Sequence, residues 1–154
     1  MIAALVVVAA VLVQVVVVNR LALPGGGVPD LVLLAVIGAA LLRGPAAGAV
    51  IGFCAGLVID VMPPVAHVAG QYAFVLAVVG YVAGRGAGGP VSTVVLCVLM
   101  APLVAAAVGG LIGDPRVTLP ALFARAPIVI VYTLIAAPAV VWLATRRRTL
   151  EYVT

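Results

Sequence analysis

The stretch GAVIGFCAGLVID, residues 48–60, decides how the rest of the sequence is interpreted. Gly48, Gly52 and Gly56 recur at every fourth position of an otherwise apolar segment, and the next position in this series is Asp60. Residues four apart lie on one face of an α-helix, so the glycines form a strip where another backbone can approach closely. In lipid, such strips favour helix packing through van der Waals contact. The stretch therefore predicts an apolar helix that packs tightly along one face and ends at a carboxylate.

The composition of the whole chain predicts that this helix lies in a membrane. Of the 154 residues, 67% are hydrophobic and 8% are charged, whereas soluble domains are about half apolar and a quarter charged. The net charge of +4 comes from arginines that are scattered among apolar runs. This pattern favours a membrane protein over a nucleic-acid-binding protein, because arginines beside membrane spans mark the cytoplasmic side. We expect contact with membrane lipid and none with nucleic acid.

Apolar runs separated by Pro, Gly and Arg predict an all-α integral membrane protein with six transmembrane helices in one domain, residues 1–154. A bilayer core about 30 Å thick needs roughly 20 helical residues, and fewer when flanking groups reach the interface. Pro29 and Pro45 fit the first turn of a helix, where a missing N–H costs nothing. Two short helices are therefore predicted before and after Arg43-Gly44-Pro45. The predicted spans are residues 2–20, 30–43, 45–60, 70–85, 91–112 and 126–145.

The arginine distribution predicts that both termini are cytoplasmic. This orientation places Arg43, Arg85 and the triplet Arg146-Arg147-Arg148 on the inside, and the triplet directly follows the last predicted span. Arginines next to a span contribute most to orientation. The remaining arginines, on the outside, are Arg20, Arg116 and Arg125. We therefore expect a multi-pass protein with N-in, C-in topology.

Residues that could carry chemistry are few and dispersed. The chain has one His, His67, one Ser, Ser92, and one Glu, Glu151. In the predicted topology His67 and Ser92 lie on opposite sides of the membrane, so they cannot form a Ser–His pair. Metal sites usually need clustered His, Cys or carboxylate groups, and Cys54 and Cys97 lie in separate apolar runs. We expect no enzymatic activity, no catalytic residue, no metal and no cofactor.

Two interpretations of Asp60 remain open. Asp60 either marks the end of a helix and faces lipid headgroups, or pairs locally and fixes the loop that follows. A carboxylate at a helix C-terminus meets the negative end of the helix dipole and is unfavourable there without a partner. The side chains predicted on the same side of the membrane, Arg20 and His67, are the candidate partners.

The glycine strip also has two interpretations. Gly80 and Gly84 repeat the four-residue spacing on the next predicted helix. The strip on residues 45–60 therefore either packs against residues 70–85 within the chain or receives the transmembrane helix of a partner protein. Spacing alone does not separate these cases. The candidate helix-packing or partner-binding residues are Gly48, Gly52, Gly56, Asp60, Gly80 and Gly84.

Residues 29–85 contain an ordered set of landmarks. A Pro-Asp pair enters a short helix, a Gly-rich helix ends in Gly-Leu-x-x-Asp, and a loop leads to a Gly, an Ala and a further apolar helix. The residues at these positions are Pro29, Asp30, Gly56, Leu57, Asp60, Gly70 and Ala73. In this respect the chain resembles the MreD family of rod-shape-determining membrane proteins.

The resemblance implies a non-enzymatic scaffold subunit of the bacterial elongation (rod) complex, in the plasma membrane, that supports lateral-wall peptidoglycan synthesis and cell shape. It implies binding to an MreC-like protein and association with RodA, a class B penicillin-binding transpeptidase and, on the cytoplasmic side, the actin-like MreB. It also implies a helix layout similar to the substrate-binding subunits of energy-coupling-factor transporters.

An alternative function is that of a small-solute-binding membrane subunit of a transporter. Such a protein needs a pocket with several convergent polar groups. Polar residues inside the predicted spans are sparse, which favours the scaffold. They are Gln14, Gln71, Tyr72, Tyr81, Ser92, Thr93, Tyr132 and Thr133.

Overall fold

The computed structural model describes residues 2–21, 23–24, 27–62, 70–86, 88–114 and 118–151, with positions 2–4, 119, 121 and 143–151 described by their backbone alone. This described part is helical and contains no strand, which confirms the all-α prediction. A short 3-10 helix, η1 (Val18–Arg20), follows α1. The α-helices are α1 (Ile2–Val16), α2 (Leu31–Arg43), α3 (Pro45–Val61), α4 (Gln71–Arg85), α5 (Pro90–Ile112) and α6 (Leu119–Glu151).

In the described part of the chain, two helical segments are long and apolar enough to cross a membrane. They are α5, Pro90–Ile112, and the Leu122–Trp142 part of α6. The helices α2 and α3 are apolar but shorter, as is the segment Leu5–Arg20. By length and composition, the two long segments support association with a membrane.

The helix α2 lies at the centre of the arrangement and contacts α1, α3, α4, α5 and α6. A helix that is hydrophobic on every side is expected to be surrounded by other elements, and the buried residues of α2 cover all of its sides. They are Val32, Leu33, Leu34, Val36, Ile37, Ala39, Ala40 and Leu41. Gly44, at φ 86, separates α2 from α3, so the two short helices are distinct.

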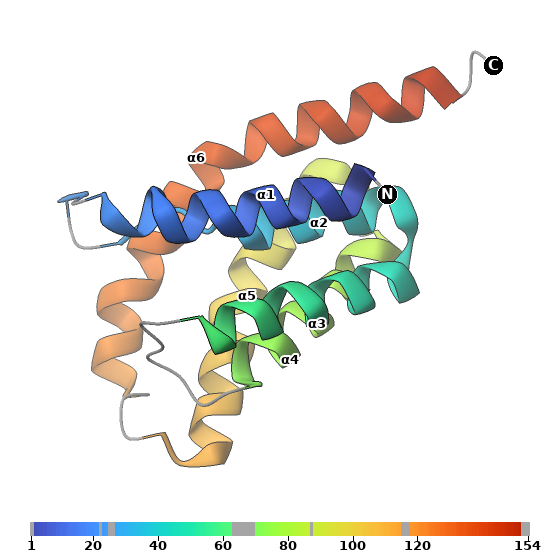
Figure 1. The fold of residues 1–154 in the computed structure, drawn as a ribbon. Coiled ribbons are helices and arrows are strands. Elements are labelled where there is room, and N and C mark those ends of the chain that lie inside the picture. The colour runs from blue at the N-terminus through green and yellow to red at the C-terminus, as the bar shows by residue number, and fades with distance from the viewer. Residues whose placement is uncertain are drawn as a thin grey trace.

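The helices α3 and α4 form the most extensive helix pair, and they lie side by side in Figure 1. A Cβ added at any of the three α3 glycines would lie closer than 3.0 Å to backbone atoms of α4. Only glycine therefore permits this approach. Gly48 faces the backbone of Gly80, Gly52 faces that of Leu76, and Gly56 faces that of Ala73.

The helix α6 is longer than the predicted span of residues 126–145. It begins at Leu119 and continues to Glu151, with Pro127 and Pro138 inside it. A proline inside a helix removes one backbone hydrogen bond and bends the helix without having to end it. Figure 1 shows such a bend between the orange first part and the red second part of α6. The side chains of the arginine triplet, residues 146–148, lie outside the described part.

Candidate functional site

Polar side chains from four helices gather where α2 and α4 begin. The first N–H groups of a helix have no partner inside the helix, so other groups must accept their hydrogen bonds. We call these acceptors, together with the tyrosine that links two of them, the N-terminal polar cluster. It consists of Gln14, Asp30, Asp60, Tyr72 and Thr133.

Three acceptors hold the start of α2: its own N-cap residue and one side chain each from α1 and α6. Asp30 is the N-cap, and its Oδ1 accepts a hydrogen bond from the Leu33 N–H at 2.8 Å. The Leu31 N–H donates to Gln14 Oε1 of α1 at 2.9 Å. The Asp30 N–H donates to Thr133 Oγ1 of α6 at 3.0 Å. The charge of Asp30 is favourable at this helix end. Pro29, predicted in the first turn, instead precedes the N-cap.

Asp60 belongs to the last turn of α3 but caps the start of α4. Its side chain is 3% exposed. Its Oδ2 accepts from the N–H groups of Gly70 at 2.9 Å and Ala73 at 3.0 Å, and its Oδ1 accepts from the Tyr72 N–H at 3.3 Å. The carboxylate thus meets the positive end of a second helix dipole, which offsets its unfavourable place on α3.

This geometry corresponds to the local pairing of Asp60, with partners that differ from the expected ones. The donors are backbone N–H groups and not the Arg20 guanidinium, which is exposed. His67 lies outside the described residues. The sequence does not reveal these backbone donors, because the periodicity of side chains does not show which other helix begins beside Asp60.

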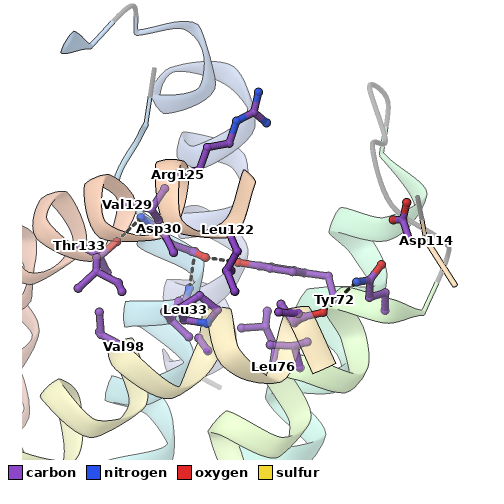
Figure 2. A pocket seen from close by; sticks show the side chains of 18 of the residues that line it. Asp30, Leu33, Tyr72, Leu76, Val98, Asp114, Leu122, Arg125, Val129 and Thr133 are labelled. Carbon is purple, nitrogen blue, oxygen red and sulfur yellow. Dashed lines mark hydrogen bonds between the residues drawn. The ribbon is translucent and has the colours of Figure 1, made fainter. Parts of the chain in front are cut away.

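Tyr72 connects the two carboxylates. Its N–H donates to Asp60 Oδ1. Its hydroxyl donates to Asp30 Oδ2, as Figure 2 shows. One residue of α4 therefore links the start of α2 to the end of α3. The sequence showed Tyr72 only as an isolated polar residue, and its one available signal was its place just after Gly70 at a predicted helix start.

The candidate glycines all pack within the chain. Gly84 faces the backbone of Gly44 and Pro45, and the other four lie in the α3–α4 contact described above. The face that was considered for a partner helix is therefore already covered by this chain's own α4. Gly70, at φ 94, precedes the first residue of α4 and donates to Asp60.

A cavity of about 420 Å³ lies between α4, α5 and α6 beside the polar cluster (Figure 2). Its volume lies within the range typical of small-molecule sites. Asp30, Gln71, Tyr72 and Thr133 contribute polar atoms to its lining. Most of the remaining lining is apolar and includes Val75, Leu76, Val98, Pro102, Leu122 and Val129.

Gln71 is the least satisfied polar residue of this cavity. It is 7% exposed, and its Nε2 donates to the Ala105 carbonyl of α5 at 3.2 Å. Because a carbonyl can only accept, this bond fixes which end of the amide is nitrogen. Within the described part of the chain, the buried Oε1 has no hydrogen-bond partner.

Within the described ranges, the charged residues that line the cavity are Asp30, Asp114 and Arg125. Arg125 is exposed, and Figure 2 shows its side chain extending away from Asp30. Among the described residues, no group of three His, Cys, Asp or Glu side chains could hold a metal ion. The arrangement is suited to binding a ligand through hydrogen bonds and apolar contact.

No family model, curated protein or solved structure matches the chain.

Proposed function

We propose that the chain is a non-enzymatic scaffold subunit of the bacterial elongation complex that binds an MreC-like protein. The observation that supports this proposal is the way in which the landmarks of the resemblance contact one another. Tyr72 links Asp30 to Asp60, and Gly70 donates to Asp60. Gly56 packs on the backbone of Ala73. Landmarks that match by chance would have no reason to form one connected unit.

The proposal includes six membrane spans with both termini cytoplasmic, in the bacterial plasma membrane. The starts of α2 and α4 lie together, since Tyr72 bonds to Asp30, as expected for helices that cross in the same direction. Their last turns carry Arg43 and Arg85, which suits a cytoplasmic face. A helix layout like that of energy-coupling-factor substrate-binding subunits is part of the same proposal.

The proposed partners beyond the MreC-like protein are RodA, a class B penicillin-binding transpeptidase and MreB. The glycine strip cannot serve as the docking surface for the MreC-like helix, because α4 covers it. The partner is instead expected on lipid-facing side chains.

A pull-down and a depletion test the scaffold function. The chain should co-purify from membranes with an MreC-like protein and fail to co-purify with a control whose transmembrane helix is replaced by polyleucine. Depletion in a rod-shaped host should produce round cells. The proposal would be refuted if depleted cells remained rods of normal width and the chain co-purified equally with the MreC-like protein and with its polyleucine control.

A second candidate function is small-solute binding for a transporter, and the cavity beside Gln71 favours it. Its volume and convergent polar groups meet the requirement that the sequence left unmet. Loss of uptake of one solute in depleted cells of normal shape would favour this function over the scaffold.

A further inference from the structure

We propose that the cavity between α4, α5 and α6 binds a small amphipathic molecule whose polar end donates a hydrogen bond to Gln71 Oε1. This inference rests on the second candidate function, small-molecule binding, and not on the scaffold function. It names the chemistry of the ligand and the residue that recognises it.

The unpartnered oxygen of Gln71 is the first observation that points to a ligand. Buried polar atoms in proteins almost always have a hydrogen-bond partner, and an exception requires an explanation. Gln71 is held in place through its Nε2 by the Ala105 carbonyl, so its amide cannot turn to satisfy the oxygen internally. An alcohol or an amine in the cavity would supply the missing donor.

The remaining polar lining also favours a donor. The Tyr72 hydroxyl is already engaged as a donor to Asp30, and the Gln71 Nε2 is engaged with Ala105. The cavity is also lined by the carboxylates of Asp30 and Asp114 and by the exposed guanidinium of Arg125. Near the two carboxylates an anionic ligand would meet like charge, while an alcohol or amine would meet acceptors.

The apolar walls determine the body of the ligand. Side chains of α5 and α6 such as Val98, Pro102, Leu122 and Val129 make most of the lining apolar. Burial of an apolar body against such walls supplies the attraction, and the polar end sets the orientation. A membrane lipid with a hydrogen-bond-donating head and an aqueous solute share this chemistry.

The test uses the full chain in phosphatidylcholine nanodiscs and the probe 1-adamantanol, a compact apolar body with one hydroxyl. Calorimetric titration should give saturable binding above that of empty nanodiscs. Adamantane-1-carboxylate, which has the same body and an anionic head, should bind more weakly. The variant Gln71→Leu should weaken binding of the alcohol about tenfold, the effect of losing one hydrogen bond.

A matched pair of variants on α6 distinguishes binding of the probe in the cavity from its partitioning into the surrounding lipid. Ala126 lines the cavity, whereas Ala139 is exposed on the same helix. Ala126→Phe should abolish binding and Ala139→Phe should retain it, with folding of both verified by circular dichroism. Equal binding by both variants, or no saturable binding to the wild type, would overturn the inference. Equal affinity for the alcohol and the carboxylate, unchanged in Gln71→Leu, would overturn the assigned role of Gln71.

The source of the natural ligand is resolved by repeating the titration in nanodiscs of phosphatidylethanolamine, whose ammonium head donates hydrogen bonds. Weaker apparent probe affinity there identifies a membrane lipid as the occupant, and unchanged affinity identifies an aqueous solute. The binding result does not depend on cell shape. Failure of the depletion experiment therefore leaves this measurement intact, and failure of binding leaves the scaffold function intact.

Discussion

Replacing Gly52 or Gly110 by alanine should change stability in opposite directions. Both glycines lie inside helices, and alanine is favoured over glycine in a helix interior by about 1 kcal/mol. A Cβ at Gly110 meets no atom of the described residues within 4 Å, so Gly110→Ala should stabilise the protein by about 0.5–1 kcal/mol. A Cβ at Gly52 would instead press against the backbone carbonyl of Leu76.

The backbone of Leu76 cannot rotate away, so α3 and α4 must separate to accept the new methyl group. Overpacking of this kind costs about 1–3 kcal/mol. We expect the upper half of that range, because the separation also loosens the neighbouring contacts of Gly48 and Gly56. After the gain in helix propensity is subtracted, Gly52→Ala should destabilise the protein by about 1–2 kcal/mol.

The assay is reversible unfolding by sodium dodecyl sulfate in mixed micelles, followed by far-UV circular dichroism. The transition of Gly52→Ala should move to lower denaturant and that of Gly110→Ala to higher denaturant. If Gly52→Ala were as stable as Gly110→Ala, the close backbone contact between α3 and α4 would not exist as described.

Four further variants test the N-terminal polar cluster and the turn before α4 by the same unfolding assay. Asp60→Ala leaves three N–H groups without their acceptor and should cost about 3 kcal/mol, whereas Asp60→Asn, which keeps one acceptor oxygen, should cost about 1 kcal/mol; equal stability of both variants would contradict the capping role. Gly70→Ala places a side chain at φ 94 and should cost about 1–2 kcal/mol, and an unchanged transition would show that this turn is not required. Tyr72→Phe removes the hydroxyl that bonds to Asp30 and should cost about 1–2 kcal/mol; if it costs nothing, the link between the two carboxylates does not contribute to stability.

Local patterns in the sequence predicted the helices better than they predicted the contacts between them. The four-residue glycine spacing identified the face of α3 that packs closely, because that property depends on one helix alone. The N-cap role of Asp30 is similarly local. The sequence predicts a last span that starts at residue 126, whereas α6 begins at Leu119 and continues through Pro127, because a proline can bend a helix without ending it.

The candidate site depends on contacts between residues far apart in the chain. Asp30 bonds to the hydroxyl of Tyr72 and donates its N–H to Thr133. Neither contact leaves a periodic trace in the sequence, because each joins separate helices. The sequence does not predict the cavity. Its lining comes from α4, α5 and α6, and no sequence motif marks it. Of the sparse polar residues along the chain, Gln71, Tyr72 and Thr133 converge on this cavity.

The central position of α2 has a consequence for the membrane that the chain can occupy. With 13 residues and a rise of 1.5 Å per residue, α2 is about 20 Å long, against a hydrocarbon core about 30 Å thick. A helix this short in contact with lipid would have to thin the bilayer locally or extend its flanking polar side chains to the interface. The start of α2 meets Gln14 and Thr133 instead of headgroups, and five helices cover its sides. In the proposed six-span arrangement, the length of α2 is therefore matched to protein, and the outer helices alone would adjust to thicker or thinner bilayers.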